Sequence, residues 1–449
     1  MTSMDRIDAS RDRALRSLEA ARGEQLRGFT QVSAEAVVER ELEAALRREA
    51  SPAESGLTGR ALAVKDNIHV AGLRNTAATP ALGDFVPEAD APAVVRLRER
   101  GMVVIGKTNM HELALGITSS HTATGPVVNA VDPARVAGGS SGGSAAVVAA
   151  GVCELALGSD TGGSTRIPAA WNDVWGFRPS TGRYDEAGGT SIAFSRDTIG
   201  PVTSSLGGLV ELDAALALPA RAAVASAPVA RIGYDPADVE LCEPAVAAAF
   251  RAALAAISAA DDCELVPVEL EAPNRVSRGF EPELGAQELA PSLRSYLASS
   301  TRLPSLERVI EQLVDPHVAH LLEGSLAATA GGVWTGTWHR LQNQIARLRA
   351  AYLRLLGEAG VVATLRPTAP TLPPALAAVL DMGIPERDAL FGRSTHFVGF
   401  ASVIGAPSLS LPLGPLLGHS MTGLLLESAP GLDAELLRLG GRLEAALDG

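Results

Sequence analysis

Lysine is almost absent from this chain, although positive charge is not. Of its 38 lysines and arginines, only Lys65 and Lys107 are lysines, and arginine supplies all the others. Lysine can lose its proton at a modest energetic cost, whereas arginine cannot. A lysine kept in such a chain is therefore a candidate for a role that needs an uncharged amine, although chance or a packing preference would also explain it.

Cysteine, net positive charge and long apolar runs are also scarce or missing. The three cysteines, Cys153, Cys242 and Cys263, cannot all pair and lack the spacing of metal ligands, which indicates a reducing, cytoplasmic setting. A formal net charge of −13 disfavours a nucleic acid or an anionic membrane as a partner. No apolar run reaches the roughly 18 residues of a membrane span, and the N-terminal residues lack the hydrophobic region of a signal peptide.

The hydrophobic pattern predicts an α/β protein. Short apolar runs typical of buried strands occur at residues 61–64, 102–105, 155–157, 264–270, 361–365, 408–411 and 424–426. Helical periodicity occurs twice within residues 1–50 and again at 90–100, 145–150, 206–218, 244–260, 306–323, 338–356 and 434–447. Turn residues dominate 175–183, and Pro-containing loops separate the helices of the middle region. The strand–helix–strand order favours a sheet with at least some parallel strands.

Nothing in the sequence divides the chain into separate domains. It has no internal repeat, no low-complexity tract and no linker long enough to mark a boundary. We therefore expect a single domain over residues 1–449. In it, the helices of residues 1–55 pack on the core, and residues 206–360 form a variable, helical region on the substrate side.

Two Gly-Gly-Ser turns, at residues 138–140 and 162–164, mark the most distinctive stretch of the chain. The first turn precedes the helix-like run 145–150, and the second follows the strand-like run 155–157. Glycines let the backbone approach a ligand closely, and a turn with several free N–H groups can bind a developing negative charge. The stretch therefore offers two serine hydroxyls and an anion site, but no base.

The base for an activated serine has two candidate sources. His69, His111 and His121 are near in sequence, but no G-x-S-x-G elbow is present and nothing marks one of them as the base of a Ser-His-Asp triad. Lys65 ends a strand-like run. As a base at neutral pH it needs its pKa lowered by about 3 units, or about 4 kcal/mol, which burial beside the serine turns could supply. The residues favour Lys65 and leave histidine open.

Three other patterns have simpler explanations. Residues 101–108 match the G-x4-G-K-[ST] spacing of a phosphate-binding loop, but the intervening residues are strand-like and a helix precedes them. His317 and His320 lack a third ligand, so we expect no metal site. Trp334 and Trp338, four residues apart, are more typical of core packing than of a ligand pocket, although both remain candidates for contact with a substrate.

The serine-rich stretch resembles the signature of the amidase signature family. Residues 138–168 carry the resemblance together with the lysine motif at 63–66, and the two family serines fall at Ser140 and Ser164. The resemblance covers about residues 57–205 and resumes at about 361–447. It implies an α/β fold with a large mixed sheet of about eleven strands covered by helices. It also implies that no cofactor or metal is needed, and a homodimer is common in this family.

The resemblance also implies a role for each residue of the motif. Ser164 would be the nucleophile that forms the acyl-enzyme. Ser140, entered through a cis peptide bond from Gly139, would relay protons to Lys65, the ultimate base. An oxyanion hole would be formed by the backbone N–H groups of Thr161, Gly162, Gly163 and Ser164. The candidates for contact with the substrate are Thr118, Trp171, Trp334 and Trp338, and Lys107 is expected to have a structural role.

Within the family, the chain is most similar to the indoleacetamide and mandelamide hydrolases. This similarity rests on residues 106–114, 116–119, 181–184 and 196–201. It implies hydrolysis of an arylacetamide-like primary amide to a carboxylic acid and ammonia. Residues 171–173 depart from the small residues usual after the signature, which leaves the shape of the pocket open.

Three alternatives stay open at this point. The substrate could be another C–N compound, such as a carbamate, an anilide or a longer acyl amide. The chain could also be the glutaminase subunit of a tRNA-dependent amidotransferase, but Ile167 stands where that branch typically has glutamine, and residues 195–198 replace its Ser-Leu-Asp-Gln run. An inactive binding protein is disfavoured because all three catalytic residues are present.

Overall fold

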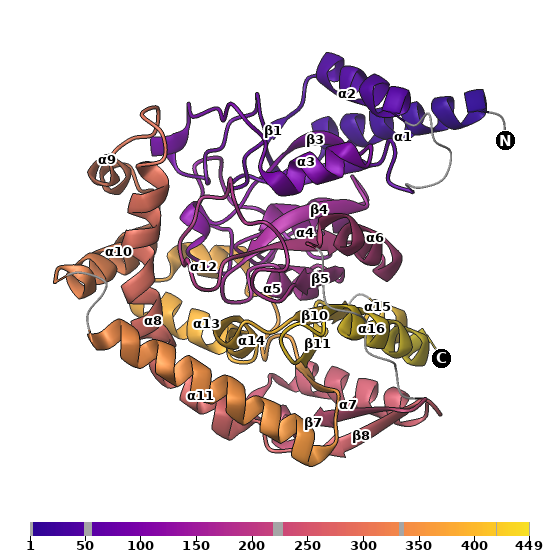
Figure 1. Cartoon of the computed structure of the whole chain (residues 1–449), viewed down its shortest axis with the longest axis vertical. Coiled ribbons are helices and arrows are strands. Elements are labelled where there is room, and N and C mark those ends of the chain that lie inside the picture. Colours follow the sequence, from indigo (N-terminus) through magenta and orange to yellow (C-terminus); the bar gives the residue numbers. More distant parts are fainter. Residues whose placement is uncertain (1–2, 49–55, 219–227, 332–335, 419, 449) are drawn as a thin grey trace.

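A computed structural model of the chain describes residues 3–48, 56–218, 228–331, 336–418 and 420–448. Within these ranges, one mixed sheet has the strand order β1-β3-β2-β4-β6-β5-β10-β11-β9-β7-β8 (Figure 1). The strands are β1 (Phe29–Val32), β2 (Ala61–Lys65), β3 (Val103–Thr108), β4 (Leu155–Asp160), β5 (Trp175–Arg178), β6 (Thr198–Thr203), β7 (Ala230–Tyr234), β8 (Cys263–Pro267), β9 (Ala363–Pro367), β10 (Ser408–Pro412) and β11 (Gly423–Ser428). The expected large mixed sheet is confirmed.

Helices cover the sheet on both faces. They are α1 (Ser3–Gly23), α2 (Glu35–Arg48), α3 (Pro92–Glu99), α4 (Gly142–Ala149), α5 (Arg166–Trp171), α6 (Leu206–Leu216), α7 (Pro244–Ser258), α8 (Glu271–Leu297), α9 (Leu306–Glu311), α10 (Pro316–Thr329), α11 (Gly336–Ala359), α12 (Leu376–Asp381), α13 (Ile384–Ser394), α14 (Gly399–Ile404), α15 (Gly414–Leu417) and α16 (Asp433–Asp448). Short 3-10 turns lie at Pro80–Leu82, Glu112–Ala114 and Pro236–Leu241. No described helix is both long and apolar enough to cross a membrane.

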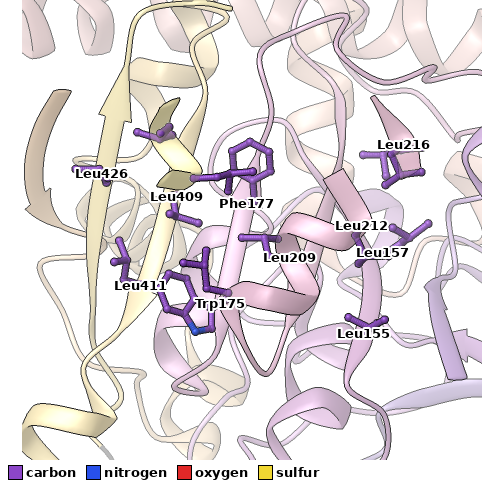
Figure 2. Close-up of a cluster of buried hydrophobic side chains, with 14 of the residues drawn as sticks. Leu155, Leu157, Trp175, Phe177, Leu209, Leu212, Leu216, Leu409, Leu411 and Leu426 are labelled. Carbon is purple, nitrogen blue, oxygen red and sulfur yellow. The ribbon is translucent and has the colours of Figure 1, made fainter. Parts of the chain in front are cut away.

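The sheet separates two apolar layers, because successive side chains of a strand point to opposite faces. In β2, Leu62 and Val64 belong to the larger cluster, whereas Ala63 belongs to the cluster on the other face with the side chains of α1 and α2. Figure 2 shows part of the larger cluster, in which leucines of α6 lie between β4 and the strands β5, β10 and β11. Both faces are covered, which is why the central strands are continuous apolar runs rather than alternating ones.

The parallel strands β2, β3 and β4 bring the functional residues to one edge of the sheet. β2 pairs in parallel with both β3 and β4. Lys65 therefore ends β2 at the same edge at which Asp160 ends β4. The turn that carries Ser164 begins directly after Asp160, so chain direction alone places the lysine beside the second serine turn.

Several local expectations were wrong. Residues 29–32 form β1 inside a region expected to be helical, and β5 occupies 175–178 where turns were expected, because each is held by a neighbouring strand. β7 was missed. The helix expected over 306–323 is divided into α9 and α10, since Asp315 caps a new helix that has proline in its first turn.

The largest error concerns α8, a helix of 27 residues in a region expected to consist of Pro-containing loops. Pro282 and Pro291 lie inside this helix. Proline removes a backbone hydrogen bond and disfavours a helix locally. Packing of α8 against α10, α11 and α14 outweighs that local preference.

Candidate active site

Lys65, at the end of β2, lies between two serine hydroxyls. Its Nζ is 2.8 Å from Ser140 Oγ and 2.8 Å from Ser159 Oγ. Asn67 Nδ2 donates a second hydrogen bond to Ser159 Oγ at 3.1 Å. The lysine side chain is fully buried. A buried amine held by uncharged partners can exchange a proton with the Ser140 hydroxyl.

Burial also sets the protonation of this amine. Desolvation lowers the pKa of Lys65 to about 7, against the weaker opposing effect of the Asp160 and Asp197 carboxylates. An ordinary lysine titrates near 10.4. A large part of Lys65 is therefore uncharged at neutral pH, as a general base requires.

The Ser140 turn is fixed by its backbone. The Gly139–Ser140 peptide bond is cis, as the resemblance implied. Ser140 O accepts hydrogen bonds from His111 N at 3.1 Å and from Ser119 Oγ at 3.4 Å. A Cβ at Gly139 would lie 2.8 Å from Ser119 Oγ, so only glycine fits there. The segment that contains Thr118 thus packs directly against this turn.

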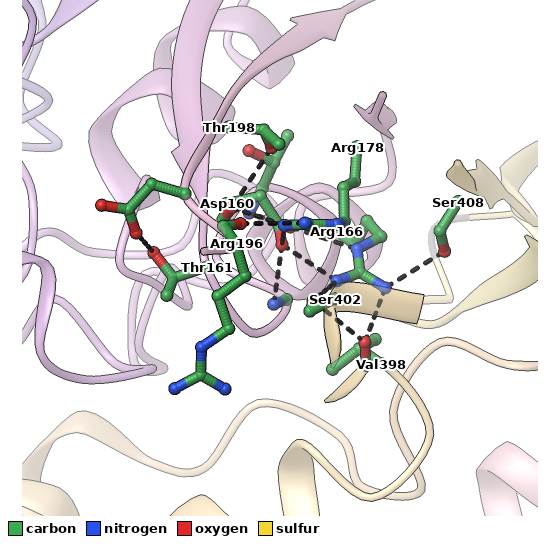
Figure 3. Close-up of polar contacts among 12 residues, drawn as sticks. Asp160, Thr161, Arg166, Arg178, Arg196, Thr198, Val398, Ser402 and Ser408 are labelled. Carbon is green, nitrogen blue, oxygen red and sulfur yellow. Dashed lines mark hydrogen bonds and ion pairs between the residues drawn. The ribbon is translucent and has the colours of Figure 1, made fainter. Parts of the chain in front are cut away.

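The Ser164 turn is wrapped around the Asp160 carboxylate (Figure 3). Asp160 accepts hydrogen bonds from the N–H groups of Gly163 and Thr165, both at 3.0 Å. Arg166 and Arg178 donate to the same carboxylate at 2.9 and 3.2 Å. Although burial favours the protonated acid, the two guanidinium groups hold the pKa of Asp160 well below its usual range. A permanent buried anion therefore shapes this turn.

The two serine turns are joined through the backbone. Ser141 N donates to Ser164 O at 3.0 Å, which places the residue after Ser140 against Ser164 itself. Gly163 has φ +112°, and a Cβ there would lie 2.4 Å from Val398 Cγ2. The second turn consequently requires glycine both for its conformation and for the close approach of the segment before α14.

The four residues expected to form the oxyanion hole differ in their hydrogen-bond partners. The Gly163 N–H is donated to Asp160, so in this arrangement it is not available to a substrate. The Thr161 hydroxyl donates to Asp197 at 2.6 Å. This bond engages the side chain and not the backbone N–H of Thr161. Within the described part of the chain, the N–H groups of Thr161, Gly162 and Ser164 have no acceptor, and these three donors remain free.

The histidine alternative has no geometric support. The rings of His69, His111 and His121 form hydrogen bonds with Tyr296, Asp315 and Arg387, respectively. None of the three rings bonds to the hydroxyl of Ser140 or Ser164. His317 pairs with Asp388 at 2.8 Å. Among the described residues, no group of three or more His, Cys, Asp or Glu side chains is arranged to hold a metal ion.

Lys107, the second lysine, supports the first. Its fully buried Nζ donates to Ile68 O at 2.6 Å and to Asn75 Oδ1 at 3.0 Å, and lies 3.5 Å from Asp66 Oδ1. It therefore ties down the loop that follows Lys65. Its strand, β3, is buried along its whole length, and residues 101–108 do not form a phosphate-binding loop.

The expected substrate-contact residues occupy different places. The Trp171 indole is fully buried and donates a hydrogen bond to Thr371 O at 3.0 Å. It packs against Gly138 and so supports the first serine turn. Thr118 Oγ1 is 2.8 Å from Ser120 Oγ. Trp338, on α11, lies against the half-exposed ring of Phe194 with centroids 5.0 Å apart. Trp334 lies outside the described residues.

Sequence reasoning missed Ser159, Asn67 and the Asp160–Arg166–Arg178 cluster. Ser159 and Asp160 directly precede the Thr-Gly-Gly-Ser turn, so their position was a usable signal. Arg178 offered none, because only the pairing of β5 with β6 brings it to Asp160.

Known proteins have sequences similar to this one along most of the chain. A family profile described as Amidase matches residues 16–424. Mandelamide hydrolase from Pseudomonas putida is 34% identical over 408 residues, covering 87% of this chain and 79% of the relative. Indoleacetamide hydrolase from Pseudomonas savastanoi is 33% identical over 401 residues, covering 87% and 84%. A glutamyl-tRNA(Gln) amidotransferase subunit from Thermus thermophilus is 34% identical over 434 residues, covering 89% and 88%.

Solved structures share the fold of this chain. A crystal structure described as an amidase is 32% identical, with a TM-score of 0.78, over 97% of this chain and 95% of that one. The peptide amidase of Stenotrophomonas maltophilia is 26% identical, with a TM-score of 0.83, over 97% and 93%. The chain therefore belongs to the amidase signature family and is a hydrolase that acts on amides.

Proposed function

We propose that this chain hydrolyses a small primary carboxamide, of the arylacetamide type, to a carboxylic acid and ammonia. The observation that carries the proposal is the 2.8 Å contact between the buried amine of Lys65 and the Ser140 hydroxyl. The similarity to a mandelamide hydrolase and an indoleacetamide hydrolase supports the substrate class, because both named substrates are primary amides with an aromatic ring near the carbonyl group.

In the first half of the proposed reaction, Ser164 becomes acylated. Lys65 Nζ takes the proton of Ser140 while Ser140 Oγ takes that of Ser164, whose oxygen attacks the amide carbon. The free N–H groups of Thr161, Gly162 and Ser164 stabilise the oxyanion. The C–N bond then breaks as Ser140 returns a proton to the nitrogen and is itself reprotonated by Lys65. Ammonia leaves, and an ester remains on Ser164.

In the second half, water takes the place of the amine. Ser140 accepts a proton from the water, again with Lys65 as the final acceptor, and the hydroxide attacks the ester carbon. The bond to Ser164 breaks, and Ser164 regains its proton through Ser140. Every proton transfer of the cycle uses only the three side chains, the substrate and water.

The nucleophile is tested by covalent labelling with a fluorophosphonate. We expect the wild-type chain to be labelled, and Ser164→Ala to remove the labelling completely. Ser140→Ala is expected to slow labelling strongly without removing it, because the attacking hydroxyl stays in place. Labelling of the Ser164→Ala protein would put the nucleophile elsewhere.

The acyl specificity is tested by assaying a panel of primary amides of different acyl size for ammonia release. We expect phenylacetamide and mandelamide to be hydrolysed faster than acetamide or a long fatty amide. The opposite order, or activity only on carbamates or anilides, would contradict the arylacetamide proposal while leaving the acyl-enzyme mechanism intact.

A second candidate is the glutaminase component of a tRNA-dependent amidotransferase. The 34% identity to the Thermus thermophilus amidotransferase protein favours it. The same assay separates the two functions. Release of ammonia from phenylacetamide by the purified chain, without tRNA or any other protein, supports the free hydrolase, whereas release from glutamine alone supports the amidotransferase component.

A further inference from the structure

The carboxylate of Glu281 lies beside the turn that carries Ser164. Glu281 is on α8, and its side chain is 24% exposed. A Cβ at Gly162 would lie 3.8 Å from Glu281 Oε1, and a Cβ at Gly399 would lie 2.6 Å from Oε2. The helix therefore holds a partly open carboxylate against the backbone that would bind the carbonyl oxygen of a substrate.

The charge of Glu281 is only partly balanced. Among the described residues, its one hydrogen bond comes from Arg196 Nη1 at 3.5 Å. The same guanidinium lies 3.3 Å from Oε2 of Glu288, which is also on α8 and is fully buried. Figure 3 shows the guanidinium of Arg196 extending away from Asp160. The backbone carbonyl oxygen of Arg196 accepts a hydrogen bond from Arg178 at 2.8 Å. One cation thus serves two carboxylates.

The other arginines near Glu281 are engaged elsewhere. Arg166 is bound to Asp160 at 2.9 Å, and Arg278 to Glu271 at 2.7 Å. Among the described residues, the contact of Glu281 with a cation is therefore the long 3.5 Å pair with Arg196, and burial raises the pKa of this carboxyl group against the weaker effect of Arg196 and Arg166. A weakly paired carboxylate close to a developing oxyanion raises the energy of the transition state. A cation brought by the substrate removes that penalty and forms a charge-assisted hydrogen bond with the open carboxylate oxygen.

We propose that Glu281 determines specificity by selecting primary amides whose acyl part carries a protonated amino group. The inference rests on the proposed function, because the amine that leaves a primary amide becomes ammonia and the cation must then belong to the acyl part. A neutral arylacetamide can occupy the same site, but it leaves the carboxylate without a partner.

The test uses the Ser164→Ala protein, in which binding is measured without turnover. The probes are para-aminomethyl-phenylacetamide, which is cationic, and para-ethyl-phenylacetamide, which has the same shape and no charge. By calorimetry we expect the cationic amide to bind at least about tenfold more tightly, as for a hydrogen bond between charged groups. Adding Glu281→Gln is expected to reduce the ratio of the two dissociation constants to about one.

Glu283→Gln is the matched control. Glu283 lies on the same helix, but its side chain is 43% exposed and pairs with Arg340 at the surface. This variant is expected to keep the tenfold ratio. Glu281→Asp, which keeps the charge on a shorter side chain, is expected to keep part of it, and thermal melts check that each variant is folded.

Three results would overturn the inference. The first is equal affinity for the two amides in the Ser164→Ala protein. The second is a preference that survives Glu281→Gln. The third is an equal weakening of both amides by Glu281→Gln, which would mean that the carboxylate binds the amide N–H itself. A clear binding preference without ammonia release by the wild-type chain would instead reject the proposed function and leave the role of Glu281 standing.

Discussion

Lys65 is a residue whose surroundings turn an ordinary cation into a base. Its nitrogen lies between the hydroxyls of Ser140 and Ser159, and the charged groups that favour protonation, Asp160 and Asp197, act more weakly than burial. With an unshifted pKa, fewer than about one lysine in a thousand would be neutral at pH 7. Burial at the end of β2 is therefore as important to the proposed chemistry as the amine itself.

Replacing Lys65 tests whether this side chain acts as a base. Lys65→Ala and Lys65→Arg should both fold, and both should lower kcat/KM for amide hydrolysis by about 10²–10⁴-fold, because neither side chain can accept the Ser140 proton. Ammonia release measures the loss, and circular dichroism checks the fold. A Lys65→Arg protein with near wild-type activity would contradict the role of a neutral amine.

The pH dependence follows from the same shift. Only the uncharged amine accepts a proton, so kcat/KM should rise with pH and level off above about 7. Because the unfolded chain keeps Lys65 protonated up to about pH 10.4, the contribution of this residue to stability should increase as the pH rises from about 7 to 10. A pH profile of the initial rate that falls through neutrality would contradict this assignment.

At the scale of elements, the turn between β4 and α5 depends on one buried anion. Asp160 joins the turn's own N–H groups to Arg166 of α5 and Arg178 of β5. The conformation of the turn is therefore fixed by contacts among β4, α5 and β5 and not by the sequence of the turn alone. Its glycines supply the conformational freedom, and Asp160 fixes the conformation by accepting hydrogen bonds from the N–H groups of Gly163 and Thr165.

Asp160→Asn should therefore be strongly destabilising. It leaves two buried guanidinium groups without their anion, which costs about 3–5 kcal/mol in comparable buried pairs. Asp132→Asn, which removes a partner of Arg135 from a surface pair with both side chains about a third exposed, should cost less than about 1 kcal/mol. Urea unfolding followed by fluorescence measures both, and equal effects of the two substitutions would contradict the proposed importance of the buried cluster.

At the scale of the whole molecule, the larger apolar cluster joins distant parts of the sequence. This cluster includes Leu57, which precedes β2, and Leu447 near the end of α16, together with α7 side chains such as Phe250. A cluster to which distant segments all contribute favours cooperative unfolding. The single domain over 1–449 stays a proposal on these grounds.

That proposal predicts one unfolding transition. Circular dichroism, which follows all helices, and tryptophan fluorescence, which is dominated by residues such as Trp171 and Trp175 near the centre, should give the same midpoint in urea. Two separated midpoints would divide the chain into independent units. The homodimer expected from the family also stays a prediction, which light scattering coupled to size-exclusion chromatography checks.

The sequence by itself determined the chemistry-bearing residues and the class of fold. The two lysines, the two Gly-Gly-Ser turns and the apolar runs are local features, which can be recognised in the sequence without a structure. The tertiary structure decided which groups are charged, which N–H groups are free and what faces the substrate. It turned the Gly163 N–H toward Asp160, lowered the pKa of Lys65 by burial and brought Glu281 from α8 to the side of the Ser164 turn. These outcomes depend on desolvation and on contacts between segments distant in the sequence, which no local pattern encodes.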